Sequence, residues 1–371
     1  MDITIQREAL LKPLQAVSGV VEKKQTLPIL ANVLLTIKNG RLFITGTDLE
    51  IELIGHIDLE SGASEGSTVT VSARKLFDIC RTTPEGMNLH LSIDKHFLVV
   101  KTASSCYQLN TLPPENFPNL ENSEYPVSFT IQQSFFKDLL SKTYFAMGQQ
   151  DVRNYLNGVF IDINQNVMKC VAADGHRLAV SSVEDGGLSD VKVKMIIPRK
   201  SVLELIRLLN SDDDYAITVK ISDNRLRIDA ADFIFTSKLI SAQYPDYNRL
   251  IPKGNLSAIG DSEAIRQALT RAAILSNEKF RGVRFQLDTN KLCITASNAD
   301  QEQAEEAVPL DYSGQKMEIG FNVAYLLDVV SALIAAKCKQ IRFIFTDANN
   351  GVLIEPLDSE NSRYVVMPMR L

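Results

Sequence analysis

Three stretches with the same pattern decide the fold: NVLLTIKNGRLFITGTD at 32–48, LNGVFIDINQNVMKCVAAD at 156–174 and RGVRFQLDTNKLCITASN at 281–298. In each stretch, apolar and polar residues alternate on both sides of a short turn that contains Asn, Gly or Asp. Such residues accept the backbone geometry of a tight turn, so each stretch is predicted to be a β-hairpin. Three hairpins at regular spacing indicate an internal repeat.

Amphipathic helices are predicted before and after every hairpin. Apolar residues recur at helical spacing, as Leu10, Leu14 and Val17 do in the first helix. Pro13 lies inside that helix and should kink it or delay its start. The six predicted helices span 6–19, 72–83, 133–145, 198–210, 261–275 and 321–337.

The repeat accounts for the whole chain of 371 residues. Aligning the second helix of each copy places Lys75 over Lys200 and Lys200 over Ala324, which are offsets of 125 and 124 residues. Proline-containing joints, ENSEYP at 121–126 and NRLIPKG at 248–254, fall where one copy meets the next. Helices that alternate with hairpins predict an α+β fold with a helix layer on one face of antiparallel sheets. The predicted domains are 1–125, 126–250 and 251–371.

The composition excludes several classes of protein. With 45% hydrophobic and 23% charged residues, the chain is neither disordered nor collagen-like. The amino terminus has no basic segment followed by an apolar core, so we expect no export signal and a cytoplasmic protein. The most apolar long segment, 321–337, contains Asp328 and is too short to predict a membrane span.

The cysteines and histidines give no sign of a disulfide framework, a metal site or a cofactor. The five cysteines are scattered and none is in a CxxC pair, so we expect reduced thiols in the core. The histidines lack the spacing of a metalloprotease site. The cysteines are Cys80, Cys106, Cys170, Cys293 and Cys338.

Charge is unevenly distributed along the chain. The net charge is −6, yet the six predicted helices hold 13 basic and 7 acidic residues, a net +6, which leaves −12 elsewhere. Basic residues could simply fill the solvent face of amphipathic helices. Alternatively, their single spacing suits diffuse, sequence-independent contact with phosphates. Twelve of the 13 basic residues are the candidates for this contact: Arg7, Lys12, Arg74, Lys75, Arg81, Lys137, Lys142, Arg199, Lys200, Arg207, Arg266 and Arg271.

Specific strings then add a family resemblance. Along the entire chain and in the same order, the sequence resembles the DNA polymerase III beta subunit family of replication sliding clamps. The strings include TLPILANVLL, TGTDLEIE, QDVRNYLNG, ADGHRLAV, DFIFTSKL, YPDYNR, AILSNEKFRGVR, EIGFNVAYLLD and the terminal YVVMPMRL.

The resemblance implies a head-to-tail homodimer in which two chains close a six-domain ring around duplex DNA. Helices would line the hole and sheets would form the outer wall. Such a protein is not catalytic: it tethers the polymerase to its template, and a separate clamp loader uses ATP. Partners implied are the DNA polymerase III alpha subunit, the loader, and other polymerases and repair proteins.

By the same resemblance, these partners dock short peptides with a glutamine and apolar anchors between the second and third domains. Ala173 and Asn349 depart from the family pattern, and without the family Leu156 and Leu178 would be read as core. The implied peptide site comprises Leu156, Ala173, Gly175, His176, Arg177, Leu178, Pro245, Arg249, Leu250, Asn322, Tyr325, Asn349, Val365, Met367, Pro368, Met369 and Arg370.

Two further sets follow from the resemblance. Asn154 stands where relatives commonly have an aromatic residue. The implied DNA-facing residues are Lys24, Arg74, Gln150, Arg153, Tyr155, Arg199, Lys200 and Arg266. The implied dimer contacts are Lys75, Tyr107 and Leu109 in the first domain and Ile274, Leu275, Asp300 and Glu302 in the third.

Two alternatives to a clamp remain at this point. An enzyme could use Asp174 and His176 with Ser181 or Ser182 as nucleophile, although the GxSxG pattern of a nucleophile elbow is absent. A protein-interaction scaffold with no DNA in its hole would fit the negative net charge.

Overall fold

The computed structural model describes residues 1–21, 27–59, 65–118, 120, 124–211 and 215–370. These residues form a threefold repeat, and each repeat consists of two β-α-β-β-β half-units in succession. The predicted hairpin, with a helix before it and a helix after it, is present in every repeat. Three strands, rather than the two of a hairpin, follow each helix.

The elements of the three repeats have the following bounds. The first repeat contains β1 (Asp2–Gln6), α1 (Arg7–Ser18), β2 (Asn32–Lys38), β3 (Arg41–Thr47), β4 (Ile51–Asp58), β5 (Thr68–Ser72), α2 (Ala73–Thr82), β6 (Asn88–Asp94), β7 (Phe97–Lys101) and β8 (Cys106–Leu112). The second contains β9 (Val127–Gln132), α3 (Gln133–Ser141), β10 (Gly158–Asn164), β11 (Val167–Ala173), β12 (Arg177–Glu184), β13 (Val193–Pro198), α4 (Arg199–Leu208), β14 (Ala216–Ile221), β15 (Arg225–Asp229) and β16 (Phe233–Lys238). The third contains β17 (Leu256–Asp261), α5 (Ser262–Ile274), β18 (Gly282–Asp288), β19 (Lys291–Ser297), β20 (Gln303–Pro309), β21 (Met317–Asn322), α6 (Val323–Ala335), β22 (Gln340–Phe345), β23 (Val352–Pro356) and β24 (Ser362–Val366).

Strand pairing divides the chain into two compact units. Unit 1 comprises 1–134 and 207–239, and unit 2 comprises 135–206 and 240–371. Unit 1 contains a 12-stranded sheet of order β1-β6-β7-β8-β5-β2-β3-β4-β16-β15-β14-β9. Unit 2 contains an eight-stranded sheet, β13-β10-β11-β12-β24-β23-β22-β17, and a four-stranded sheet, β20-β19-β18-β21. All these pairs are antiparallel, as the sequence predicts.

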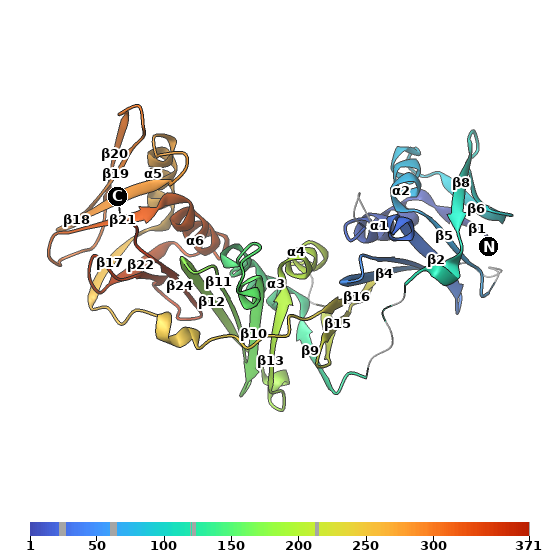
Figure 1. Cartoon of the computed structure of the whole chain (residues 1–371), viewed down its shortest axis with the longest axis horizontal. Helices are drawn as coiled ribbons and strands as arrows, with labels where there is room; N and C mark the ends of the chain where they lie inside the picture. The colour runs from blue at the N-terminus through green and yellow to red at the C-terminus, as the bar shows by residue number, and fades with distance from the viewer. Residues whose placement is uncertain (22–26, 60–64, 119, 121–123, 212–214, 371) are drawn as a thin grey trace. The chain divides into compact units, whose positions relative to one another are not determined.

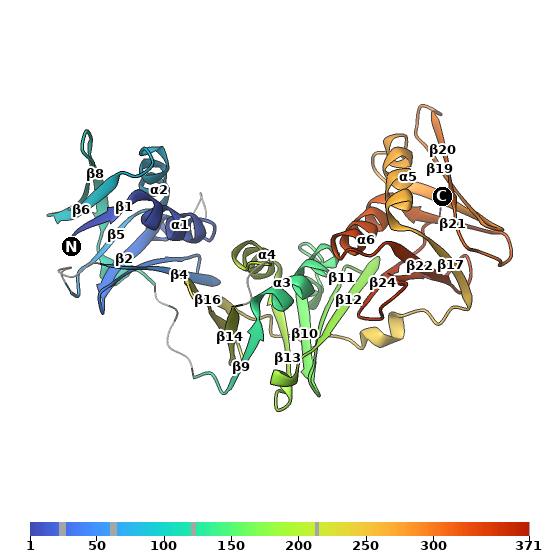
Figure 2. The same ribbon diagram turned by 180° about the vertical axis from the view of Figure 1, so that it is seen from behind.

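The helices cover one face of these sheets. Within unit 1, α1 packs beside α2 and against β3 and β4, and within unit 2, α5 packs beside α6 and against β19 and β20 (Figures 1 and 2). Side-chain caps begin several helices: the Ser72 hydroxyl accepts the Lys75 N–H in α2, and the Asp261 carboxylate accepts the Ala264 N–H in α5. The predicted helix ranges agree with the observed ones to within about two residues, except that α3 ends earlier, at Ser141.

Helix starts correct the predicted alignment of the repeats. The second helices begin at Ala73, Arg199 and Val323, so the first offset is one residue longer than predicted. Lys200 is therefore equivalent to Arg74, and Lys75 is equivalent to a buried position. Both repeats have two adjacent basic residues here, and sequence spacing alone could not separate the two alignments.

Pro13 does not delay the start of α1, which was one of the two effects expected from the sequence. The helix begins at Arg7 and continues through Pro13 to Ser18. Pro13 is buried against β4, where a Cβ on Gly55 would come within 2.7 Å of the Pro13 Cβ. The missing side chain of Gly55 therefore makes room for the proline ring in the core.

The cysteine prediction is partly wrong. All five cysteines are free thiols, but only Cys80 and Cys170 are buried, and Cys106 is exposed on β8. Burial raises the pKa of the Cys80 thiol to about 11. Among the described residues, no helix is both long and apolar enough to cross a membrane.

The repeats are joined by equivalent strand pairs. Antiparallel β4–β16 pairing places Leu53 opposite Phe235, and β12–β24 pairing places Ala179 opposite Tyr364. Phe235 and Tyr364 are fully buried. The first-repeat equivalent of these aromatics is Tyr107 on β8, because the hairpin pairs that locate them are Val100 with Tyr107, Ile228 with Phe235 and Ile354 with Tyr364.

Truncating the aromatic side chain at the first of these junctions should be costly. We expect Phe235→Ala to lower the free energy of unfolding by about 3–5 kcal/mol, because a fully buried phenyl ring is lost. Urea unfolding followed by far-UV circular dichroism measures the change. The matched control is Phe135→Ala, whose side chain is largely solvent-accessible. Equal losses in the two variants would contradict the packing described here.

Candidate functional site

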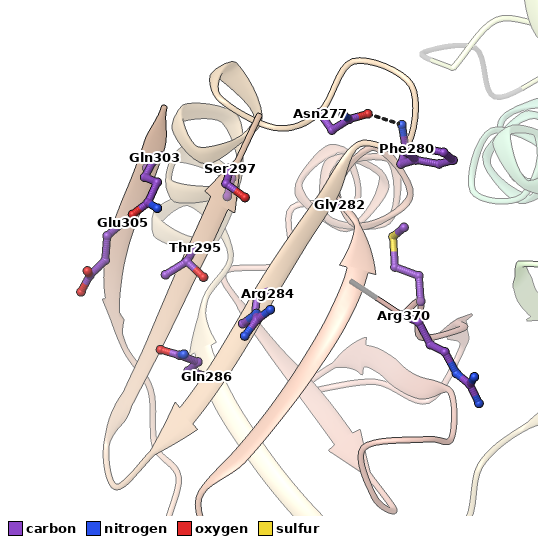
Figure 3. A pocket seen from close by; sticks show the side chains of 13 residues that line it. Asn277, Phe280, Gly282, Arg284, Gln286, Thr295, Ser297, Gln303, Glu305 and Arg370 are labelled. Atoms are coloured by element: carbon purple, nitrogen blue, oxygen red, sulfur yellow. Dashed lines mark hydrogen bonds between the residues drawn. The ribbon is translucent and has the colours of Figure 1, made fainter. Parts of the chain in front are cut away.

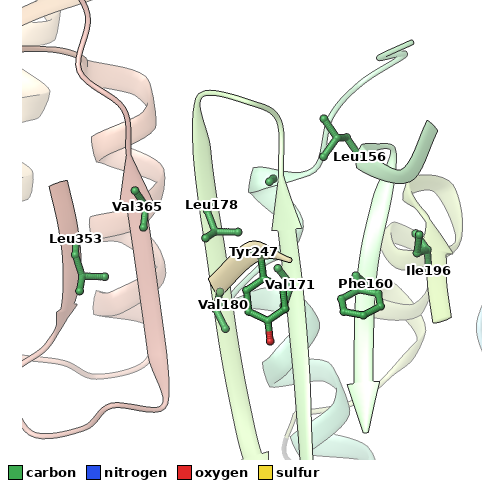
Figure 4. Close-up of a cluster of buried hydrophobic side chains, with 10 residues drawn as sticks. Leu156, Phe160, Val171, Leu178, Val180, Ile196, Tyr247, Leu353 and Val365 are labelled. Carbon is green, nitrogen blue, oxygen red and sulfur yellow. The ribbon is translucent and has the colours of Figure 1, made fainter. Parts of the chain in front are cut away.

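An apolar cluster in unit 2 joins the second repeat to the third. Pairing of β12 with β24 places Leu178 directly opposite Val365 and sets both on the same face of the sheet. Leu156 approaches from the short 3-10 helix Asn154–Leu156, which precedes β10. Figure 4 shows how the side chains converge on this face. The cluster comprises Leu156, Phe160, Val171, Ala173, Leu178, Val180, Ile196, Tyr247, Leu353 and Val365.

The segment after β16 crosses this cluster. Its path begins where the Ile240 N–H donates to the Ile196 carbonyl on β13. Tyr244 then stacks on Phe160, with ring centroids 4.7 Å apart and an angle of 7° between the rings. Tyr247 follows and is buried. The segment thus supplies aromatic rings that cover the outer face of β10 and β11.

Arg177 is held by neighbours on several sides. Its guanidinium donates to the Asp174 carboxylate at 3.0 Å and forms an ion pair with Asp328 on α6. It also donates to the Phe145 carbonyl and lies 4.5 Å from the centroid of the Tyr325 ring. The side chain is only 10% exposed. Arg177 therefore ties the β11–β12 turn to α6.

His176 and Tyr325 form the aromatic edge of the site. Their rings stack with centroids 6.1 Å apart, and His176 is exposed. Burial raises the pKa of the Tyr325 phenol, and the nearby carboxylate of Asp174 acts in the same direction. This edge of the site therefore presents the neutral phenol of Tyr325 and the accessible imidazole of His176.

The C-terminal segment runs along the same edge. The Met367 N–H donates to the His176 carbonyl, and the Met369 N–H donates to the Gly320 carbonyl on β21. The Met367 side chain is 46% exposed, although it adjoins the buried Val365. Methionine side chains repack readily around different apolar groups, which suits a surface that accepts several ligands.

The remaining residues of the predicted peptide site differ in exposure and in the elements on which they lie. Pro245, Arg249 and Leu250 are exposed on the segment that crosses the cluster, with Arg249 paired to Asp246. Asn322 instead accepts the Ala324 N–H and caps α6. Gly175 takes a positive φ of +90° in the β11–β12 turn. Asn349 lies in a turn built on Asp347, Pro368 and Met369 are half-buried, and Arg370 is exposed.

The predicted DNA-facing cations are mostly engaged with nearby acceptors. Arg74 lies 3.7 Å from Asp78, and Arg199 donates to the Met147 carbonyl. Arg266 forms two hydrogen bonds with Glu263, which lower the pKa of that carboxyl to about 2.

The other residues predicted to face DNA lie close to the apolar cluster or are not among the residues that the structure describes. Arg153 donates to Asp151, lowers the pKa of that carboxyl to about 2, and covers Gly175. Tyr155 packs edge-on against Tyr244. Gln150 is exposed with a positive φ, and Lys200 is half-buried. Lys24 lies outside the described residues.

Four of the seven predicted dimer residues lie on or beside two incompletely paired strands, β8 and β20. Tyr107 and Leu109 are on β8, which pairs with β7 along its length but with β5 only at Thr111 and Leu112. Asp300 and Glu302 precede β20, which is the last strand of its sheet. Ile274, at the end of α5, is 75% exposed, and Leu275 beside it is half-buried. Lys75 is exposed on α2.

No catalytic triad forms around Asp174. Its carboxylate accepts the backbone N–H groups of His176 and Arg177 and pairs with the Arg177 guanidinium, so it does not orient the imidazole. Ser181 is buried with its hydroxyl 3.2 Å from that of Ser362. Among the described residues, no group of His, Cys, Asp and Glu could hold a metal ion.

Sequence reasoning missed the residues that hold the site together. Phe145, Tyr244 and Asp328 contact Arg177 or Phe160 from distant parts of the chain. Tyr244 and Tyr247 belong to the string YPDYNR, whose aromatic spacing could have indicated packing. Asp328 gave no such signal, because its partner Arg177 is 151 residues away.

Comparison with known proteins places these features in a family. The sequence matches the N-terminal, central and C-terminal domains of the DNA polymerase III beta subunit at residues 1–121, 130–246 and 248–370. It is 46% identical over 372 residues to the Beta sliding clamp of Pseudomonas aeruginosa and 47% identical over 374 residues to that of Escherichia coli. Each comparison covers 100% of both chains.

Solved structures agree in fold over the whole chain. The DNA polymerase sliding clamp from Pseudomonas aeruginosa, solved with a ligand, superposes with a TM-score of 0.95 at 46% identity. The Bartonella birtlesii sliding clamp bound to griselimycin superposes with a TM-score of 0.94 at 33% identity. Both cover 100% of each chain. With three domain matches in order, full-length relatives and the same three tandem clamp-fold domains, this chain belongs to the DNA polymerase III beta subunit family.

Proposed function

We propose that this chain works as a replication sliding clamp: two copies close a ring around duplex DNA and tether DNA polymerase III to its template. The observation that supports this most directly is the full-length similarity to sliding clamps together with the two incompletely paired edges, β8 and β20. The chain is a non-catalytic subunit, and the engagement of Asp174 by Arg177 agrees with this. We place its work in the cytoplasm, where bacterial DNA is replicated.

Internal equivalence supports ring closure between β8 and β20. The first two junctions, β4–β16 and β12–β24, pair the fourth strand of one repeat with the last strand of the next. In the third repeat the corresponding strand is β20, and in the first repeat the last strand is β8. A second copy of the chain supplies each with the missing neighbour, which protects exposed backbone groups and gives a head-to-tail dimer.

The same equivalence gives a register for the proposed contact. In the hairpins β3–β4, β11–β12 and β19–β20, the equivalent pairs are Gly46 with Leu53, Ala172 with Ala179 and Ala296 with Ala304. Tyr107 should therefore lie opposite Ala304 of the second copy and become buried, as Phe235 and Tyr364 already are. Leu109, Ile274 and Leu275 would pack around it, and Lys75 would face the acidic Asp300 and Glu302.

The proposed domains are 1–125, 126–250 and 251–371, each one repeat. Their helices would supply the DNA-facing cations Arg74, Arg199, Lys200 and Arg266. The other proposed DNA-facing residues are Lys24, Gln150, Arg153 and Tyr155. Exposed ion pairs such as Arg74 with Asp78 are weak, so phosphates can compete for these cations. Contacts of this kind hold DNA loosely and without sequence preference.

We further propose that partner peptides dock on the apolar cluster of unit 2. Partners would be the DNA polymerase III alpha subunit, the clamp loader, and other polymerases and repair proteins. The exposed Leu250 and Met367 flank the buried cluster and offer apolar contact, while His176 and Tyr325 offer polar groups beside it. Arg177 would keep the β11–β12 turn in place without contacting the peptide itself.

A scaffold with no DNA in its hole is the second candidate, and the net charge of −6 favours it. It would form the same dimer and bind the same peptides. Only a measurement that depends on encircled DNA separates it from a clamp.

Release from cut DNA tests the proposed clamp directly. We expect the protein, loaded on nicked circular DNA by a clamp loader with ATP, to stay on uncut circles and to dissociate after one double-strand cut. An encircling ring slides off an end, whereas a protein held by direct contact does not. Gel filtration of the labelled protein with its DNA measures the retention. Equal retention on circular and linear DNA would refute encirclement, and no retention on circles would favour the scaffold.

Truncation at the end of α5 tests the proposed dimer contact. We expect Ile274→Ala combined with Leu275→Ala to shift the protein to monomers at sub-micromolar concentration, because apolar area at the β8–β20 junction is lost. Multi-angle light scattering gives the mass. The control is Val152→Ala, at an exposed apolar residue that belongs neither to β8, β20 nor α5, and this variant should remain dimeric. A mass that stays dimeric in the double variant would refute this contact.

Substitution beside the apolar cluster tests peptide docking. We expect Met367→Ala to weaken binding of a peptide with one glutamine followed by leucine and phenylalanine by about tenfold, which corresponds to about 1.4 kcal/mol. Fluorescence polarisation of the labelled peptide measures the affinity. Ile93→Ala, at an exposed site in unit 1, serves as the control and should bind normally. Unchanged affinity in the Met367 variant would place the peptide elsewhere.

A further inference from the structure

The third repeat has a hollow of about 700 Å³ on the outer face of its four-stranded sheet (Figure 3). We name it the third-repeat pocket. Side chains from β18, β19 and β20 form its floor, and the C-terminal segment closes one side. Its lining residues are Asn277, Phe280, Gly282, Arg284, Gln286, Thr295, Ala296, Ser297, Gln303, Ala304, Glu305, Met369 and Arg370.

Strand register identifies this pocket as the third-repeat equivalent of the apolar cluster in the second repeat. Gly282 of β18 corresponds to Gly158 of β10, and the hairpin pairs Ala172 with Ala179 and Ala296 with Ala304 align the following strands. Six cluster residues, Leu156, Phe160, Val171, Ala173, Leu178 and Val180, thereby correspond in order to Phe280, Arg284, Thr295, Ser297, Gln303 and Glu305. The pocket therefore occupies the same place in the third repeat as the apolar cluster does in the second, but five of the six corresponding side chains are polar.

Among the residues that the structure describes, no segment crosses this pocket as one does in the other two repeats. In each repeat the segment after the last strand begins to cross the sheet at an equivalent point: Leu112 at Thr70, Ile240 at Ile196 and Met369 at Gly320. In the first repeat the segment continues until the Leu120 N–H meets the buried Glu52. In the second it continues to the buried Tyr247, and in the third the described segment extends only to Arg370.

The lining indicates what could bind where a chain segment crosses the sheet in the other two repeats. Thr295, Ser297 and Gln303 make no side-chain hydrogen bond to any residue that the structure describes, so their donors can serve a ligand. Arg370 is exposed and has no ion pair within the described chain, and Arg284 pairs only with Glu318. Both cations lie on the β18 and C-terminal side in Figure 3, whereas Glu305 lies at the β20 end.

We propose that the third-repeat pocket binds an extended, acidic segment of a partner protein, which continues the path that the C-terminal segment begins at Met369. Carboxylates of such a segment would meet Arg370 and Arg284, and hydroxyl and amide groups of the pocket floor would donate to it. This inference rests on the proposed docking of partners, because the C-terminal segment borders both sites. A partner would then make two contacts with the chain: an apolar contact at the cluster of unit 2 and a polar, charged contact at the third-repeat pocket.

The test uses the intact dimer and a fluorescein-labelled peptide of sequence Gly-Ser-Glu-Ser-Asp-Ser-Glu-Ser-Gly, which has no apolar anchor. We expect saturable binding, at least about fivefold tighter than that of the same peptide with Gln and Asn in place of the acids. Thr295→Glu should weaken binding of the acidic peptide about fivefold, because it adds a like charge to the pocket floor. Ser297→Glu is a second variant with the same expected result.

Lys291→Glu is the matched control. It lies on the same strand and outer face but does not line this pocket, and it changes the net charge by more than Thr295→Glu does. We expect its affinity to stay within about twofold of the unmodified protein. Equal weakening by Lys291→Glu, equal binding of the neutral peptide, or absence of saturable binding would each overturn the proposal.

A titration with the glutamine, leucine and phenylalanine peptide separates this proposal from the proposed function. That peptide should bind Thr295→Glu as it binds the unmodified protein. If it failed to bind any variant, the docking proposal would fail, while the result with the acidic peptide would still decide the pocket.

Discussion

The fold depends on antiparallel pairing between the fourth strand of one repeat and the last strand of the next. A strand at the edge of a sheet exposes backbone donors and acceptors that need partners. β4 with β16 and β12 with β24 satisfy this need within the chain, and each pair brings an aromatic ring into the core. The apolar cluster, the path of the segments that cross it and the remaining open edges all follow from these two pairs.

The same junction is filled differently in each repeat. At the equivalent position the first repeat has the buried Glu52, whose pKa is raised by burial and which accepts the Leu120 N–H. The second has Leu178 in an apolar cluster, and the third has Gln303 in a polar pocket. One backbone arrangement thus supports a closed polar junction, an apolar surface and an open polar pocket, depending on the side chains and on whether a described segment crosses it.

Much of this architecture could be predicted from the sequence, because hairpin turns and helical periodicity are local signals. The three hairpins and six helices appear close to their predicted positions. The alignment of the repeats was harder to predict. Arg74 and Lys75 are adjacent cations, and the observed starts of α2 and α4 were needed to show which one corresponds to Lys200. Pro13 misled for a similar reason, since the space that accepts it is provided by Gly55, which is distant in sequence. The anchoring of Arg177 by Asp328 depends on tertiary contact and left no local pattern.

The two open edges differ in charge. β8 has the sequence CYQLNTL and contains no charged residue, whereas β20 contains Glu305 and Glu306 and is preceded by Glu302. Two copies of β20 placed edge to edge would bring carboxylates against one another, which is unfavourable for a directly opposed pair. A neutral edge facing an acidic one has no such cost. Repulsion between carboxylates therefore disfavours pairing of β20 with a second β20 and leaves pairing of β20 with β8 as the favourable arrangement.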